Sequence, residues 1–441
     1  MRKIISVLLI FTVSCGLFSG CYDKREIDDQ TYVIAIGMDK GTVQPLKLTL
    51  QYAMTQSVGG GSSGGGSSSG GGNKVLSSVT IDTETFNSGI TAANGFIGKR
   101  INMSHAIVLV ISKELAKEGI SKYIYGLSRE RHYRPSMFVA VARGSAEGYL
   151  NSINPLQEVD PSKYYQLLFN AYKFTGYTAN TQFFNFYTHM TALDMQAVAV
   201  LAGVSRYQNS DEFKSKYSTY KKKNKIHPSE GDFKAGDIPE NNAEKGEIMG
   251  LAMFNGDKMI GELDGDETES YLMVTGEFHQ SYVSVPDPKF PQESVLLRIE
   301  KRKKPKYKTK FINGKSEISI DIKLEGDFVS IQSGYNYENS KNFSIIENAA
   351  SELISKRINE TLNKTAKDYN CDIFGFGKSV KKIFLTNKKW EEFKWLDKYK
   401  ASSFTVNVDL KLRRTGLIIR TSPTPIAEGG ESSKNESSED N

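Results

Sequence analysis

Residues 31–38 read TYVIAIGM, a run of β-branched and apolar residues that predicts a buried strand. Residues 43–54 continue with partial alternation and predict its neighbour. Strands and helices then alternate along the chain, with strands expected at 75–81, 106–111 and 137–141, and helices at 83–97 and at 113–125, the second interrupted at Gly119. Such alternation predicts a mixed α/β layer, and we assign residues 21–200 to an N-terminal domain.

A Gly/Ser tract interrupts this domain at residues 57–73, SVGGGSSGGGSSSGGGN. Its side chains offer almost no apolar area for a core, so we expect a disordered surface insertion between strands. A linker between domains is the alternative, although the strands on its two sides are too few to make separate domains.

A smaller middle domain is predicted for residues 201–294. It begins with a polar stretch at 205–247. Two strands follow, at 248–254 and 258–263, and Asn255-Gly256 between them favours a type I′ hairpin turn. Asp264 and Glu267 then have the spacing of a capping box for a short helix that runs through Met273.

Residues 295–421 are predicted to form a third domain, a β-sheet covered by one long helix. Strands are expected at 295–299 and at 308–324, the second broken by an Asn313-Gly314 turn, and at 404–412 with one wet face. Ser344 and Glu347 have capping-box spacing. The apolar stripe of the helix consists of Ile346, Ala350, Leu353, Ile354, Ile358 and Leu362. Residues 422–441 are expected to be a disordered tail.

Composition restricts the class of protein. The 441 residues carry a formal net charge of +6, with basic and acidic residues interleaved, which does not indicate a nucleic-acid partner. There are only three cysteines, at positions 15, 21 and 371, so neither a disulfide framework nor a cysteine zinc site is expected. We interpret Cys371 as a small buried residue rather than a catalytic thiol.

The N-terminus predicts export. Residues 1–21, MRKIISVLLIFTVSCGLFSGC, place two positive charges before an apolar run that is too short for a membrane span. Residues 17–21, LFSGC, have the form of a bacterial lipobox, so we predict a signal peptide at 1–20 and lipidation of Cys21. Cys15 is a rival site, and an ordinary signal peptide with a chance cysteine is the competing interpretation. Two acyl chains on Cys21 would give stable membrane attachment.

Candidate chemistry is sparse. The five histidines, at positions 105, 132, 189, 227 and 279, show no metal-ligand spacing, and we expect no cofactor or metal. The acids at 264–269 fit a helix cap better than paired catalytic carboxylates or a calcium loop. The basic run at 301–310 is interpreted as a solvated strand face or loop, with anionic headgroups or an acidic partner as the alternative. The aromatic residues between 164 and 195 are interpreted as core rather than as a binding platform.

Several short stretches follow one another in order along the chain. They are CYDKREI at 21–27, VIAIGMD at 33–39, Ser104-His105 before AIVLVI, KELAKEGI at 113–120, GLAMF at 250–254 with Gly261-Glu262-Leu263, FGFG at 374–377, Trp390, and RRTGL at 413–417. Together they resemble the Ger(x)C family of germination lipoproteins. Tyr22 stands where the family has tryptophan, and the Gly/Ser tract lies outside the family pattern.

The resemblance implies an α+β protein of three small mixed domains in an elongated arrangement, held by its lipid on the outer face of the inner spore membrane. It implies that the chain acts with membrane-embedded A and B type subunits as one nutrient germinant receptor, but it does not define a molecular activity. We expect a non-enzymatic scaffold, because a hydrolase would need a convergent nucleophile and base, which the sequence does not indicate. A solute-binding lipoprotein that captures a small nutrient for a transporter is the runner-up, and a lipid-anchored hydrolase is less favoured. No catalytic or ligand-binding residue is implied, only the acylated Cys21.

Overall fold

Nine strands form the larger of two sheets in the computed structural model, which describes residues 1–6, 26–53, 75–130, 133–155, 158, 160–205, 229–240, 246–312, 315–339 and 341–414. Cys21, the Gly/Ser tract at 57–73, the Asn313-Gly314 turn and the tail at 422–441 lie outside these ranges, so the predictions made for them remain predictions.

The order in this sheet is β3-β2-β1-β5-β6-β7-β8-β9, with β4 beside β1. The strands are β1 (Gln30–Lys40), β2 (Leu46–Ala53), β3 (Leu76–Thr83), β4 (Arg100–Asn102), β5 (Val108–Ser112), β6 (Phe138–Ala142), β7 (Val198–Val204), β8 (Gly246–Asn255) and β9 (Lys258–Leu263). The central strands β1, β5, β6 and β7 are parallel, and the strands on both sides of them are antiparallel. Residues 33–39 of β1 are buried, as their apolar run predicts.

Helices cover both faces of this sheet. One face packs against α2 (Phe86–Ile97), α3 (Lys113–Glu118), α4 (Ser121–Ser128) and α7 (Phe183–Met190). The other face packs against α5 (Ala146–Ser152) and α6 (Pro161–Phe169). The predicted break at Gly119 separates α3 from α4, because Gly119 adopts a φ of 126°. Half of the ten predicted aromatic core residues, among them Tyr165, Phe169 and Phe183, are buried, whereas Phe174 and Phe184 are exposed.

The predicted hairpin of the middle segment is present, but it does not build a sheet of its own. β8 pairs with β7, so the sheet runs past the predicted boundary between residues 200 and 201, which falls inside β7. The turn type was also predicted wrongly. Asn255 pairs with Lys258, which leaves Gly256 and Asp257 at the centre. Only Gly256 has a positive φ, so this is the glycine-first pattern of a type II′ turn.

The second sheet has four strands in the order β10-β11-β12-β13, and only β12 and β13 are parallel. The strands are β10 (Gln280–Pro286), β11 (Ser294–Ile312), β12 (Lys315–Ile331) and β13 (Ser403–Arg414). β11 is one continuous strand where two shorter ones were expected. Irregular pairing between Lys301 and Lys306 accommodates Pro305, and most of the basic run at 301–310 lies exposed on this strand.

The long helix α10 (Phe343–Asn363) is the first helix of the connection from β12 to β13. It covers the sheet through the predicted stripe, of which Leu353 alone is only half-buried. The capping box predicted at Ser344 is wrong. Helix α10 begins at Phe343 without a side-chain cap, and the Glu347 carboxylate instead accepts from the backbone N–H of Leu412 at 2.9 Å. The Glu347 carboxylate therefore accepts a backbone hydrogen bond from strand β13 instead of capping helix α10.

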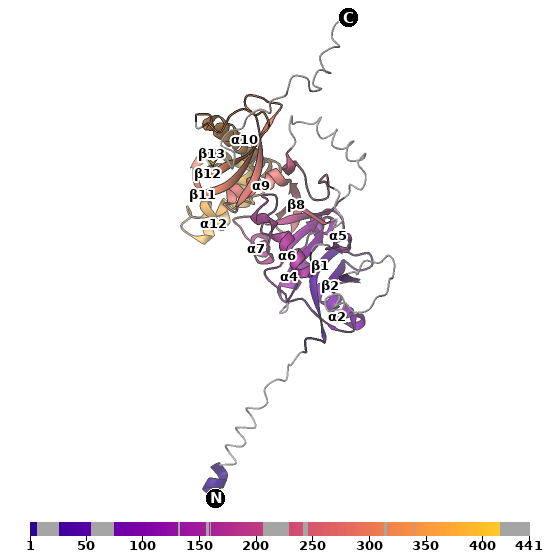
Figure 1. Cartoon of the computed structure of the whole chain (residues 1–441). Helices are drawn as coiled ribbons and strands as arrows, with labels where there is room; N and C mark the ends of the chain where they lie inside the picture. Colours follow the sequence, from indigo (N-terminus) through magenta and orange to yellow (C-terminus); the bar gives the residue numbers. More distant parts are fainter. Residues whose placement is uncertain are drawn as a thin grey trace, which may run out of the picture.

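Helix α9 (Gly265–Thr275) lies between the two sheets and is buried along most of its length. The capping box predicted for Asp264 and Glu267 is confirmed, with Asp264 accepting from the Glu267 N–H at 2.9 Å. One continuous cluster of buried apolar residues extends from the first sheet through α9 into the second sheet. The molecule is thus a mixed α/β protein whose two sheets occupy the two ends of an elongated body (Figure 1).

Candidate functional site

A crevice opens at the carboxyl ends of the parallel strands β1, β5 and β6. The chain leaves β5 toward α3 on one face of the sheet and leaves β6 toward α5 on the other face. Open α/β sheets bind ligands at such a switch point. A cavity of about 540 Å³ lies here, and a second one of about 300 Å³ adjoins it across the turn at 143–145.

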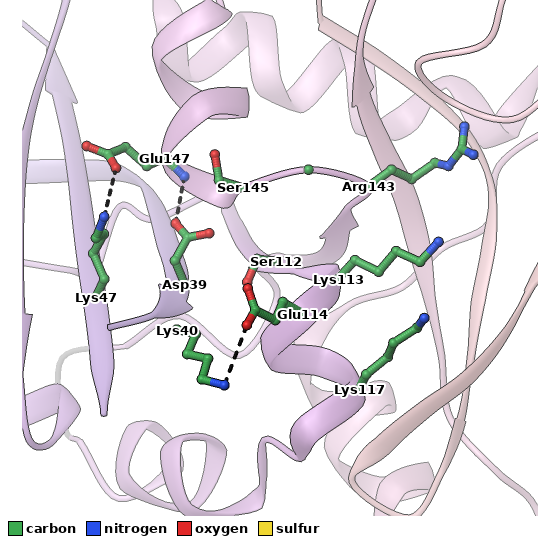
Figure 2. A pocket seen from close by; sticks show the side chains of 11 residues that line it. Asp39, Lys40, Lys47, Ser112, Lys113, Glu114, Lys117, Arg143, Ser145 and Glu147 are labelled. Atoms are coloured by element: carbon green, nitrogen blue, oxygen red, sulfur yellow. Dashed lines mark hydrogen bonds and ion pairs between the residues drawn. The ribbon is translucent and has the colours of Figure 1, made fainter. Parts of the chain in front are cut away.

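Asp39, at the end of β1, holds the crevice in shape. Its carboxylate accepts from the backbone N–H groups of Ala146 at 2.7 Å and Glu147 at 2.8 Å, at the start of α5 (Figure 2). Burial raises the pKa of Asp39, and these two hydrogen bonds oppose that effect. Because its oxygens are engaged with α5, Asp39 positions the helix and is not free to act on a ligand.

Five cationic side chains line the larger cavity. They are Lys40, Lys47, Lys113, Lys117 and Arg143. Lys40 pairs with Glu118 at 3.1 Å, and Lys47 pairs with Glu147 at 3.6 Å. Lys117 has no ion pair within the described ranges. Figure 2 shows Lys113, Lys117 and Arg143 extending in the same direction, away from Asp39.

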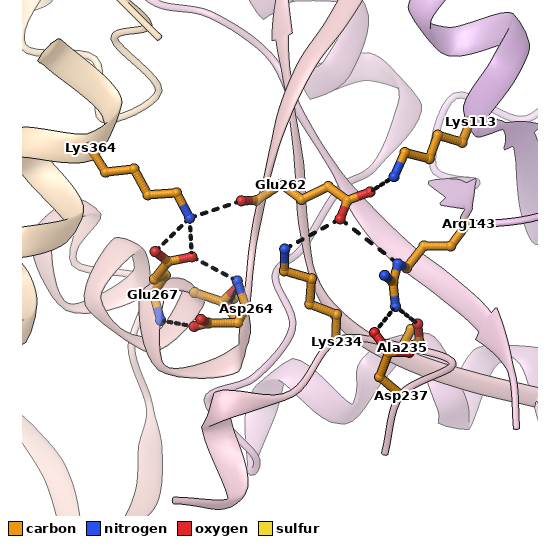
Figure 3. Close-up of polar contacts among 10 residues, drawn as sticks. Lys113, Arg143, Lys234, Ala235, Asp237, Glu262, Asp264, Glu267 and Lys364 are labelled. Carbon is orange, nitrogen blue, oxygen red and sulfur yellow. Dashed lines mark hydrogen bonds and ion pairs between the residues drawn. The ribbon is translucent and has the colours of Figure 1, made fainter. Parts of the chain in front are cut away.

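Glu262 of β9 forms ion pairs with three of the surrounding cations. Its carboxylate lies 2.6 Å from Lys113, 3.3 Å from Lys234 and 3.8 Å from Arg143 (Figure 3). Burial works to raise the pKa of Glu262, but the hydrogen bond from Lys113 and the charges of Lys234 and Arg143 outweigh it and lower that pKa. The wall of the crevice is therefore a preformed ionic network.

This network continues into the second sheet's unit. Lys364, next to the end of α10, donates to the backbone carbonyl of Glu262 at 3.1 Å and to the Glu267 carboxylate at 2.6 Å (Figure 3). One lysine therefore joins β9, the start of α9 and the end of α10.

The serine hydroxyls of the crevice serve as helix caps. The Ser112 and Ser145 hydroxyls cap α3 and α5, and no histidine is among the residues that line the larger cavity. Across the described ranges, no three His, Cys, Asp or Glu residues are grouped so as to hold a metal ion. Lys117, the lining cation that has no ion pair within the described ranges, is available to an anionic group such as a carboxylate.

The structure disperses the residues that the sequence singled out. Asp266 pairs with Arg357 at 3.2 Å, so the acids of α9 serve packing and capping and do not converge on a site. Cys371 is buried against the Phe254 carbonyl, and burial raises the pKa of its thiol, as its interpretation as a core residue predicts. His105 packs edge-on against Tyr32, and burial lowers the pKa of His189 to about 4.

The FGFG stretch at 374–377 wraps around a buried carboxylate. Asp372 accepts from the backbone N–H groups of all four residues and from the Trp395 indole at 2.8 Å. Gln196, just before β7, bonds the Asp372 backbone in both directions at 2.8 Å. This loop therefore ties the two sheets together and is structural.

Two family models match the chain, one for each part. Residues 23–203 match the model described as "Spore germination protein N-terminal domain", and residues 249–416 match "Spore germination B3/ GerAC like, C-terminal". This chain belongs to the GerAC-like family of spore germination proteins. Across the described ranges, none of the helices is both long and apolar enough to cross a membrane.

Relatives of this GerAC-like chain align over nearly their whole length. "Spore germination protein KC" of Bacillus subtilis (strain 168) is 23% identical, covering 95% of this chain and 97% of that protein. "Spore germination protein GerQC" of Bacillus cereus is 20% identical, covering 93% and 98%. The solved structure "Crystal Structure of the GerBC protein" superposes with a TM-score of 0.49 at 13% identity, covering 86% of this chain and 96% of that one.

Sequence reasoning missed the crevice of this GerAC-like protein. Asp39 stood out only as the last residue of the family stretch at 33–39, and Arg143 did not stand out at all. One signal was available in the sequence. Each of three buried strands has a polar or charged residue at or directly after its end, and these residues are Asp39, Ser112 and Arg143.

Proposed function

We propose that this protein is the lipid-anchored C-type subunit of a nutrient germinant receptor and that it works as a non-enzymatic scaffold. In this proposal, acyl chains on Cys21 hold it on the outer face of the inner spore membrane, beside membrane-embedded A and B type subunits. The observation that carries the proposal is the match of both GerAC-like models, in order, over residues 23–203 and 249–416.

The position of β1 is compatible with that anchor. Strand β1 begins at Gln30, nine residues after Cys21. Nine extended residues span at most about 30 Å, so an acylated Cys21 would keep the first sheet close to the bilayer. A tether of this length raises the effective concentration of the protein at membrane partners.

The connections between the two sheets support a scaffold role. The shared apolar core, the Gln196 to Asp372 bonds and the Lys364 bridge join the sheets at three places. Because the interface between the sheets is packed and its ionic groups are paired, the two sheets would move together as one rigid body.

Deletion of the gene tests the proposal. Response to one class of nutrient germinant should be slowed or abolished, whereas germination by calcium dipicolinate, which acts downstream of the receptors, should stay nearly intact. Immunoblots of purified inner membranes should show less of the partner subunits. An unchanged nutrient response, together with turnover of a peptide, ester or glycan by the purified protein that one substitution abolishes, would replace the scaffold with a hydrolase.

A second candidate function, capture of a small anionic solute, is favoured by the cationic crevice. Lys117→Gln tests it without disturbing an ion pair of the described structure, and exposed Lys99→Gln is the matched control. Solute capture predicts that Lys117→Gln shifts the germinant concentration for half-maximal response severalfold and that Lys99→Gln does not. Identical responses in both variants argue for the scaffold alone.

A further inference from the structure

Residues 381–389, KKIFLTNKK, form an exposed basic loop that carries two aliphatic side chains. The loop connects α11 (Gly377–Lys381) to α12 (Asn387–Phe393) in the unit of the second sheet. Leu385 is 93% exposed and Ile383 is 55% exposed. Figure 1 shows α12 at the margin of the body, away from β1, β2 and α2.

The loop is held in this shape by the residue between the two aliphatic side chains. The ring of Phe384 lies 4.8 Å from that of Phe393 and 5.7 Å from that of Trp390, measured between centroids. With Phe384 packed inward, Ile383 and Leu385 are presented to solvent on either side of it. Because the ring of Phe384 is packed, the backbone on either side of it is fixed, and the exposure of Ile383 and Leu385 does not result from local fraying.

The charges of the loop have one sign. Lys381, Lys382, Lys388 and Lys389 are exposed, and residues 381–389 contain no acid. None of the four lysines has an ion pair within the described ranges. Two acids, Glu391 and Glu392, follow further along α12.

Two of these lysines contradict the local rules of helix stability. Lys388 and Lys389 occupy the first turn of α12, which contains no acid, although the dipole of a helix disfavours cations there. Residues that break a local rule without a compensating contact are expected at functional surfaces. The charges of these exposed lysines are therefore available to a partner outside the fold.

We propose that the 381–389 loop is a second membrane contact, with its lysines on anionic headgroups and Ile383 and Leu385 in the interface. Lysines on both sides of exposed aliphatic residues suit a charged surface over an apolar layer, where long side chains reach the headgroups. The inference rests on the proposed function for the presence of a bilayer. Anchored near β1 and touching lipid near α12, the elongated body would lie along the membrane.

Fluorescence quenching tests this contact. The only tryptophans, Trp390 and Trp395, are buried, so the indole introduced by Leu385→Trp can be followed in the full chain. It should be quenched by brominated lipids in vesicles of phosphatidylcholine with phosphatidylglycerol, and not in phosphatidylcholine alone. Changing all four lysines to glutamine should weaken vesicle binding at least about fivefold.

Val43→Trp is the matched control, because Val43 is an 86% exposed aliphatic residue in the turn after β1. Absent quenching at position 385, or equal quenching at positions 385 and 43, overturns the proposal. Partner subunits lost on Leu385→Ala without lipid quenching would reassign the loop to a protein contact. Repeating the experiment with the chain produced from residue 22, which carries neither the signal peptide nor the acylated cysteine, separates the two proposals, since the loop should still be quenched when the anchor is absent.

Discussion

Lys364 places its Nζ 2.6 Å from Oε1 of Glu267, which joins the end of the long helix α10 to the capping box of α9. The same Glu267 carboxylate accepts from the Asp264 backbone N–H at 2.9 Å, and the same lysine reaches the carbonyl of Glu262 (Figure 3). The ion pair is mostly shielded from solvent, so its two partners depend on each other more than a surface pair would.

Lys364→Met should therefore destabilise the protein by about 1–3 kcal/mol, because it leaves the Glu267 carboxylate without its cation. Denaturant unfolding measures the loss. Lys356→Met, at an exposed position of the preceding helix α10, is the control and should stay within about 0.5 kcal/mol of the parent. Equal effects of the two substitutions would show that the bridge contributes nothing.

Glu269 should make stability depend on pH. Burial, and next the charge of Asp266, raises the pKa of Glu269 from 4.5 to about 7. The folded state therefore holds this proton more tightly than the unfolded state. The contribution is fully present below the ordinary pKa and is lost as pH rises through about 7.

We accordingly expect the free energy of unfolding to fall between about pH 5 and pH 7, and Glu269→Gln to reduce that fall. Chemical denaturation across the pH series gives the slope. Glu352→Gln, an exposed acid on α10, should leave the slope unchanged. A steeper fall in Glu269→Gln than in the parent would contradict the assignment.

Gly377 should tolerate no side chain. A Cβ there would lie 2.3 Å from the Asp194 carbonyl oxygen and 2.6 Å from the Trp395 ring. Gly377→Ala should cost about 1–3 kcal/mol and lower the melting temperature. Gly95→Ala, in α2 with no heavy atom within 4 Å, should instead stabilise by about 0.5–1 kcal/mol. A neutral Gly377→Ala would mean that the loop around Asp372 can shift.

Cys21 should be the acylated residue. Lipidation requires its thiol, so Cys21→Ala should block both acylation and cleavage of the signal peptide, and Cys15→Ala should block neither. Mass spectrometry of the mature N-terminus measures both. A lipid lost from the Cys15 variant and kept in the Cys21 variant would reverse the site assignment.

Local sequence patterns determined much of the secondary structure. The apolar run at 31–38 became β1, the Asp264 and Glu267 spacing became a capping box, and the stripe from Ile346 to Leu362 became the buried face of α10. These features follow from side-chain period and from hydrogen bonds between near neighbours. The family, too, was recognisable from short stretches distributed along the chain.

Tertiary structure decided what depends on partners distant in sequence. That β8 joins the first sheet is set by its pairing with β7, and the loss of the Ser344 cap is set by the bond from Leu412 to Glu347. The crevice exists because parallel strands bring the residues after their ends, such as Asp39 and Arg143, to one edge of the sheet. Each of these contacts joins residues tens of positions apart, so a local pattern does not encode it, and strand pairing and packing within each unit decide it.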